Sequence, residues 1–249
     1  MTPAECAEGA PRLLRNALRR PRLAALLDRG GALTVVRGAS GSGKTVALRA
    51  WVEEATARTF WITVTPEISA SADFAESAMS LLRRSGADVP TQPAGDPWER
   101  PRAAAAGIGE PLVLIVDDAA IAQERTLEDM CRLVTSVANL RLIAAENRRT
   151  ELDRPGLGLL VDRTEIGPRE LMLDDDEIRR LLDVDAAVAA EVREATGGFP
   201  AIVHAIAQQG PDVGGAAALR AAFDAVTDFF ACAWTRSGRN GMSRTLFSA

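Results

Sequence analysis

Apolar residues gather in short continuous runs along the first two thirds of the chain, and segments with helical spacing separate them. Four such runs occur, at residues 32–36, 60–64, 112–116 and 140–145. Three segments with apolar residues at helical spacing lie between them, at 45–55, 74–82 and 127–138. Short runs rich in Val, Ile and Leu are typical of strands buried on both faces of a parallel sheet. The alternation predicts an α/β domain.

Two further segments are assigned from their prolines and glycines. Residues 12–27 have leucines at helical spacing, and they predict a helix that is broken at Pro21. Residues 86–101 hold several prolines and glycines and predict a mobile loop.

The pattern becomes wholly helical in the last third of the chain. Asp174 and Glu177 have the spacing of a capping box, Gly197-Gly198 is a typical helix end, and Pro200 is suited to a first helical turn. Four short helices are predicted, one opening at Asp174, one over 186–195, one from Pro200 and one over 219–234. The predicted domains are an α/β core at 1–166 and a helical module at 167–249. No stop signal closes residues 237–249, so we expect a chain that can continue into a longer protein.

A glycine-rich segment directly follows the first predicted strand and precedes a predicted helix. It matches G-x-x-x-x-G-K-[ST] in full, and the strand and helix around it are the context that identifies a phosphate-binding loop. Backbone N–H groups of such a loop form a nest for phosphate oxygens, and the helix N-terminus adds positive potential. The predicted phosphate-binding residues are Gly38, Ala39, Ser40, Gly41, Ser42, Gly43, Lys44 and Thr45.

Lys44 is the only lysine in the chain, and every other basic side chain is an arginine. A compact ammonium fits the narrow space of a phosphate-binding loop, whereas a planar guanidinium does not. Lys44 is therefore predicted to reach the β- and γ-phosphates, and the Thr45 hydroxyl to coordinate Mg²⁺. The alternative, a glycine-rich turn with a stray lysine, leaves the strand and helix context unexplained.

Two acids follow the most apolar run of the chain. Asp117 ends that run and is predicted to hold Mg²⁺ through water, while Asp118 is placed to polarise an attacking water. Asp118 is shorter than the glutamate that active ATPases often carry at this position. The sequence therefore predicts slow hydrolysis.

Composition narrows the function classes. A net charge of −5 and a pI near 5.1 argue against non-specific nucleic-acid binding by this chain. Three cysteines without C-x-x-C spacing predict neither a disulfide framework nor a zinc site, and they fit a reducing cytoplasm. No apolar run has the length of a membrane span. A guanine-reading Asn/Thr-Lys-x-Asp segment is ruled out because it needs a second lysine, which favours adenine.

The order of these motifs resembles the N-terminal ATPase domain of the large MalT-like LuxR regulators, which belong to the STAND class of signalling NTPases. The resemblance covers roughly residues 12–235. It is carried by Arg20-Pro-Arg-Leu23, the loop at 38–45, Trp51, Phe60-Trp-Ile-Thr-Val64, Leu140-Arg-Leu-Ile143 and Gly198-Phe-Pro200. It implies an ASCE-type parallel sheet followed by a small helical lid.

The resemblance also implies a switch mechanism. ADP would hold a closed form, and inducer with ATP would open it and allow self-association. Pro21 and Pro200 would both lie near the adenine, and DNA would be bound only through a domain absent from this chain. The family's Ser-Arg pair after the fourth strand aligns here with Glu146-Asn147, and Arg148 follows one residue later.

Spacing alone leaves some functions open. By its spacing alone, Gly198-Phe-Pro200 is an ordinary corner between two helices. His204, the only histidine, is predicted to be a packed or half-exposed helix residue. A regulatory ATP/ADP switch, a working AAA-like ATPase of the helicase-loader or remodelling type, and a truncated remnant without function are the three alternatives.

Overall fold

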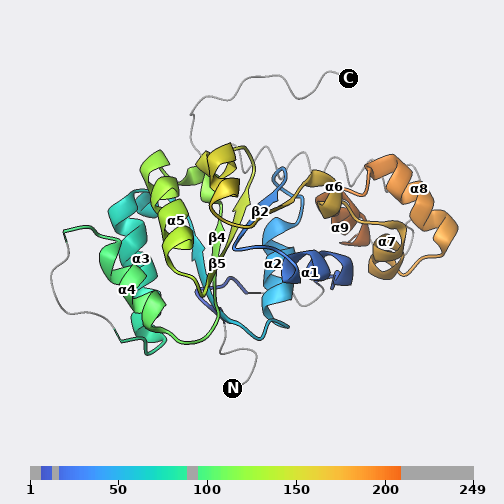
Figure 1. Ribbon diagram of the computed structural model, residues 1–249. Helices are drawn as coiled ribbons and strands as arrows, with labels where there is room; N and C mark the ends of the chain where they lie inside the picture. Colours follow the sequence, from blue (N-terminus) through green and yellow to red (C-terminus); the bar gives the residue numbers. More distant parts are fainter. Residues whose placement is uncertain (1–6, 13–16, 89–94, 209–249) are drawn as a thin grey trace. The chain divides into compact units, whose positions relative to one another are not determined.

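A computed structural model describes residues 7–12, 17–88 and 95–208 of the 249-residue chain (Figure 1). The chain divides into two compact units, Met1–Met172 and Leu173–Ala249. The domain boundary predicted at residue 166 stays a prediction. In the described ranges, no helix is both long and apolar enough to cross a membrane.

The first unit is built on a parallel sheet. Its strands are β1 (Ala7–Glu8), β2 (Leu33–Arg37), β3 (Arg58–Thr63), β4 (Leu112–Asp117), β5 (Leu140–Glu146) and β6 (Arg163–Ile166). Their order is β1-β3-β4-β5-β2-β6, and every pairing is parallel. β5 therefore lies between β2, which leads into the glycine-rich loop, and β4, which ends in Asp117. This is the ASCE arrangement of P-loop NTPases, and it confirms the predicted α/β fold. The helical lid that was predicted to follow it stays a prediction.

Helices cover both faces of this sheet. They are α1 (Pro21–Asp28), α2 (Lys44–Val52), α3 (Ser71–Arg84), α4 (Glu99–Gly107), α5 (Glu124–Ser136) and α6 (Pro168–Leu171). Short 3₁₀ segments lie in the connections, with η2 (Pro66–Ile68) before α3, η3 (Ala119–Ile121) before α5, and η4 (Glu151–Asp153) and η5 (Pro155–Leu159) between β5 and β6. α3, α4 and α5 pack on one face, and α1 and α2 on the other (Figure 1).

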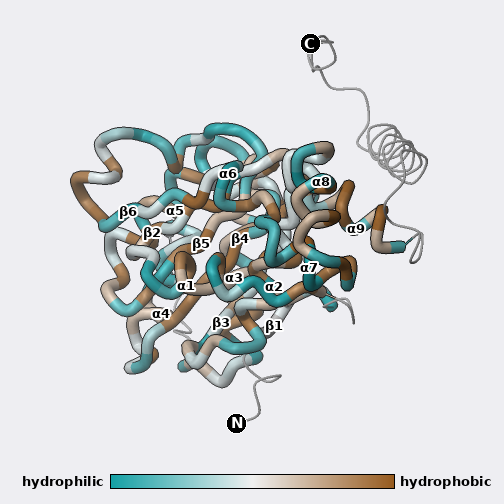
Figure 2. Tube along the Cα trace, turned by 90° about the vertical axis from the view of Figure 1, so that its right-hand side faces the viewer, coloured by the Kyte–Doolittle hydropathy of each residue, from teal (hydrophilic) through white to brown (hydrophobic). Residues whose placement is uncertain are grey.

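Strand β4 shows how the sequence fills both layers. Leu112, Leu114 and Val116 belong to the core on the α3–α5 face, and the alternate residues Val113 and Ile115 to the core on the α1–α2 face. All six residues of β4 are buried, and the trace there has the colour of hydrophobic residues (Figure 2). A strand with no solvent face needs a continuous apolar run, which is why its pattern does not alternate.

Two predicted segments differ from the structure. α1 begins at Pro21, and residues 17–20 are not helical, so the predicted break is the start of the helix. Proline fits a first turn because an N–H group at that position would have no partner within the helix. The last residues of the loop predicted at 86–101 belong to α4. The start of this helix was not predicted because the segment before it is rich in proline and glycine. Trp98 anchors that start, because its ring stacks on Phe74 at 5.6 Å and its indole N–H donates to Ser71 Oγ at 2.7 Å.

The second unit contains three described helices, α7 (Asp175–Leu182), α8 (Ala186–Thr196) and α9 (Pro200–Gln208). The predicted capping box forms, because Glu177 N–H donates to Asp174 Oδ1 at 2.8 Å and Asp174 N–H to Glu177 Oε2 at 3.2 Å. Gly197 ends α8 with φ of 61°, as predicted. His204 is half-buried on α9. The helix predicted at 219–234 lies outside the described residues.

Candidate functional site

The glycine-rich loop has the backbone of an anion nest. Gly41 and Gly43 adopt φ of 81° and 80°, in the left-handed region that glycine enters without strain. Gly43 is the N-cap of α2, and no side chain caps the helix there. The first N–H groups of a helix have no partner within the helix, so this end of α2 offers donors to a bound anion.

Lys44 lies within this loop and closes it. Its side chain is buried, and Nζ donates to the carbonyl oxygens of Gly38 at 2.8 Å and Ala39 at 3.2 Å. Burial lowers the pKa of Lys44, while the negative charges of Asp118 and Asp117 act to raise it. The two hydrogen bonds tie Lys44, near the end of the loop, to its first residues.

Ser42 provides a test of whether the loop suits a phosphate. Its hydroxyl is buried, and Oγ has no hydrogen-bond partner within the described residues. A Cβ added to Gly38 would lie 2.5 Å from this oxygen, so the glycine leaves room around it. An unpaired buried hydroxyl costs about 1–3 kcal/mol, and a phosphate oxygen would satisfy it. The donor set of the loop thus fits an oxyanion.

Thr45 of α2 and Asp117 of β4 are in contact, although β5 separates β4 from the strand that leads into the loop. The Thr45 hydroxyl donates to Asp117 Oδ2 at 2.8 Å, and Asp117 Oδ1 accepts the N–H of Asp118 at 3.1 Å. Burial raises the pKa of Asp117, and the hydrogen bond from Thr45 opposes that rise. Hydroxyl and carboxylate oxygens are ligands that Mg²⁺ accepts. The two predicted metal residues are therefore adjacent.

The remaining predicted site residues are Asp118, Pro21 and Pro200. Asp118 is exposed, with a left-handed backbone at φ of 55°, and it opens η3. Pro21 is exposed at the start of α1, where it lines a cavity of about 90 Å³ with Ala47 and Trp51 of α2. Pro200 is buried in the second unit as the first residue of α9. The roles of Asp118 in hydrolysis and of both prolines at the adenine stay predictions.

Comparison with known proteins now places this site in a family. The sequence matches the model of the AAA domain over residues 19–211, which is most of the chain. The chain belongs to the AAA domain family. No curated protein matches the sequence significantly.

Two solved structures share the architecture of this AAA domain. A Walker-type ATPase of Pyrococcus abyssi is 13% identical with a TM-score of 0.58, over 92% of this chain and 78% of that one. A STAND protein of Pyrococcus horikoshii with a tetratricopeptide repeat sensor is 15% identical with a TM-score of 0.54. The alignment covers 81% of this chain and only 31% of that protein. At these identities the likeness is one of fold.

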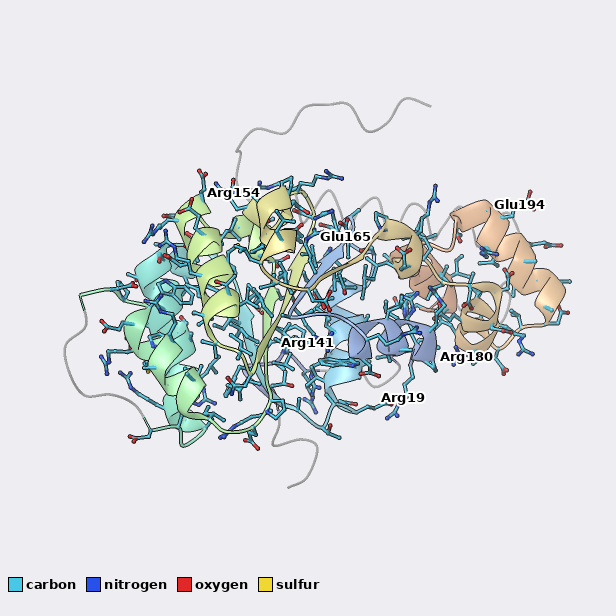
Figure 3. The ribbon with its side chains drawn as sticks, viewed as in Figure 1. Arg19, Arg141, Arg154, Glu165, Arg180 and Glu194 are labelled. Atoms are coloured by element: carbon cyan, nitrogen blue, oxygen red, sulfur yellow. The ribbon has the colours of Figure 1, made fainter. Side chains whose placement is uncertain are left out.

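An ion-pair network that sequence reasoning missed lies directly before the loop of this AAA domain. Arg37, the last residue of β2, donates to Glu146 Oε1 through Nε at 3.0 Å and Nη2 at 2.6 Å. It also pairs with Asp153 of η4 and Glu165 of β6, and Glu165 is labelled in Figure 3. The signal was a charged residue at the end of each of two neighbouring parallel strands.

Glu146 is the last residue of β5, and with Asn147 it aligns with the Ser-Arg pair of the family that the sequence resembles. Here it is fully buried, and its side chain also accepts the Thr150 hydroxyl at 2.8 Å. Its backbone carbonyl accepts the N–H of Gly38 at 3.1 Å. Burial raises the pKa of Glu146, and the bond to Arg37 opposes that rise. Glu146 therefore fixes the start of the loop.

Arg148 follows the tip of β5 and lies on the loop after β4. It is exposed, and its Nη2 donates to the carbonyl oxygen of Ala120 at 2.6 Å. Ala120 is two residues beyond Asp118. The guanidinium is thus held beside the loop that carries the predicted hydrolytic acid.

Proposed function

We propose that this AAA domain binds ATP and ADP with Mg²⁺ at the loop of residues 38–45. The observation that carries the proposal is the 2.8 Å contact between Thr45 and Asp117 at the end of a loop with left-handed glycines. The loop's N–H groups and the Ser42 hydroxyl would hold phosphate oxygens, and Lys44 would neutralise their charge. Mg²⁺, when bound, supplies further charge neutralisation between the phosphate oxygens.

Binding is tested by titrating a fluorescent ATP analogue into the wild-type chain with and without Mg²⁺. Saturable binding that excess ADP displaces is expected. Failure of the unlabelled nucleotide to compete would contradict the proposal. Inorganic triphosphate serves as a second competitor, because it occupies the phosphate nest without needing an adenine site.

We further propose that the domain is a regulatory switch of a MalT-like LuxR regulator of the STAND class, with slow turnover. The order of sequence motifs and the fold shared with a STAND protein support this reading. Slow turnover is supported by the short, exposed Asp118. The closed form would hold ADP, and ATP would favour self-association. Contact with DNA would require a domain outside this chain.

The alternative is a working AAA-like ATPase of the helicase-loader or remodelling type. It is favoured by Arg148, whose guanidinium lies on the loop after Asp117-Asp118, because a nearby arginine accelerates hydrolysis in P-loop enzymes by about 10³–10⁵. Phosphate release at saturating MgATP separates the two functions. We expect turnover well below the roughly 1–100 s⁻¹ of kinases, and a rate within that range would favour the working ATPase.

A further inference from the structure

Arg141 lies at the end of the sheet opposite the glycine-rich loop. Within the described ranges no carboxylate contacts it, and the charge that acts on it is that of Asp28. It is the second residue of β5, whose other end is Glu146, and Figure 3 shows it at the opposite end of the sheet from Glu165. Nε donates to the carbonyl oxygen of Gly31 at 3.2 Å, and Nη2 donates to that of Leu27. Its Nη1 donates to no described residue. One arm of a half-buried guanidinium is therefore available to a ligand.

Arg58 provides an internal comparison. Both arginines lie over an aromatic ring, Arg58 at 6.0 Å from the centroid of Phe60 and Arg141 at 5.8 Å from that of Trp51. Arg58 also pairs with the Glu110 carboxylate at 3.2 Å. Arg141 lies over its ring in the same way, but no carboxylate contacts it, because Asp28 is engaged by the Trp51 indole N–H and acts on Arg141 only through its charge. A partly desolvated cation of this kind favours an anion from solution.

A cavity of about 520 Å³ opens beside Arg141, within the size range of small-molecule sites. Both polar and apolar side chains line it. The lining includes Asp28, Trp51, Pro111, Val113, Asn139 and Arg141.

The surroundings hold the guanidinium and the indole in place. A Cβ on Gly30 would lie 2.4 Å from Arg141 Nη2, so a side chain at this position would displace the guanidinium. The Trp51 indole N–H donates to Asp28 Oδ1 at 2.7 Å, which fixes the ring beneath Arg141. Neither feature depends on the glycine-rich loop.

We propose that this cavity is a second ligand site, which binds a small molecule carrying a carboxylate and an apolar body. The carboxylate would accept hydrogen bonds from Arg141, whose planar fork matches that geometry. The apolar body would pack on the more accessible lining residues Ala55, Ala57 and Pro111. A hydroxyl or ammonium group would suit the Asp28 carboxylate. The site differs from the nucleotide site, because Trp51 lies seven residues along α2 from Lys44, about 10 Å at 1.5 Å per residue.

The experiment uses 8-anilinonaphthalene-1-sulfonate as the probe, since its sulfonate stands in for the carboxylate and its rings for the apolar body. Energy transfer from tryptophan reports binding to the wild-type chain. We expect saturable binding that saturating MgADP does not displace. Competitive displacement by MgADP would overturn the proposal, because the probe would then occupy the loop at 38–45.

Two variants locate the probe. Arg141→Gln is expected to weaken binding about tenfold or more, the effect of losing a charge-assisted hydrogen bond. Arg58→Gln is the matched control and should leave affinity within about twofold. Equal affinity for wild type and Arg141→Gln, or equal losses in both variants, would overturn the proposal. If circular dichroism shows Arg141→Gln to be unfolded, Arg141→Lys replaces it, with an expected loss of about threefold or more because the planar fork is removed.

Discussion

Replacement of Asp117 by asparagine should change the stability of the free protein and its stabilisation by ligand in opposite directions. The side chain is 3% exposed. Burial raises the pKa of Asp117 above its ordinary 3.8, and the Asp118 charge acts in the same direction, against the Thr45 hydrogen bond. The folded chain therefore binds a proton here more tightly than the unfolded chain. The stability that this group contributes is present below about pH 4 and is lost as the pH rises through the folded-state pKa.

The size of the effect follows from the burial and the two hydrogen bonds. Desolvating an ion costs several kcal/mol, most of which the bonds from Thr45 and Asp118 offset. Asparagine keeps an acceptor oxygen and removes the charge, so we expect a gain of about 1 kcal/mol near neutral pH, or about 2–4 °C in Tm. In the wild type, MgADP at a hundredfold excess over Kd should add about 2.7 kcal/mol. Asp117→Asn should lose the part that depends on Mg²⁺.

Thermal unfolding near neutral pH measures both effects, with ADP present in Mg²⁺ or in EDTA. Asp129→Asn is the matched control, because Asp129 is also buried but pairs with Arg125 and Arg132, away from the loop. The control should lose stability without ligand and keep the full increment from Mg²⁺. A lower Tm for ligand-free Asp117→Asn, or an unchanged increment from Mg²⁺, would refute this account of the site.

Three further predictions concern single residues. Lys44→Ala should abolish binding of a fluorescent ATP analogue, because no other lysine can replace it, and equal affinity for wild type and variant would contradict the loop assignment. Glu146→Gln should weaken ATP and inorganic triphosphate equally, since it removes the ion pair to Arg37, the residue before the loop, and competition titrations that show selective loss of one of them would count against positioning. Pro200→Gly should weaken ATP and ADP but not inorganic triphosphate, and hydrogen exchange should show ADP protecting both 41–45 and 198–202. Protection confined to 41–45 would remove the basis for a helical lid, provided the ligand-free variant unfolds like the wild type.

Much of the fold was predictable because its signals are local. Strand β4 has no solvent face, so its apolar run alone identified it, and the capping box at Asp174 identified the start of α7. Strand β6 was missed because Arg163-Thr-Glu-Ile166 has only its last residue buried. Such a strand exists through pairing with β2, a partner distant in sequence, and no local pattern records that pairing.

The candidate site, like the fold, was predictable only where its signals are local in the sequence. The loop at 38–45 and Asp117 follow from motif and spacing, because backbone geometry makes those residue types necessary. The network of Arg37, Glu146 and Asp153 was not predicted, since it depends on which strands are neighbours. Arg141 was invisible for the same reason. Only the arrangement in space shows that Arg58 is in contact with the Glu110 carboxylate and that Arg141 is in contact with none.

Because Lys44 is the only lysine, proteolysis by a lysine-specific protease reports on the glycine-rich loop alone. A protease specific for lysine can cleave this chain only after Lys44, into residues 1–44 and 45–249. That bond enters the first turn of α2, and the side chain is buried, so cleavage requires the loop and helix to open. When opening and closing are fast, the rate of cleavage follows the population of the open form. The free energy of opening this one loop is therefore measurable from the appearance of two fragments, without any label or substitution.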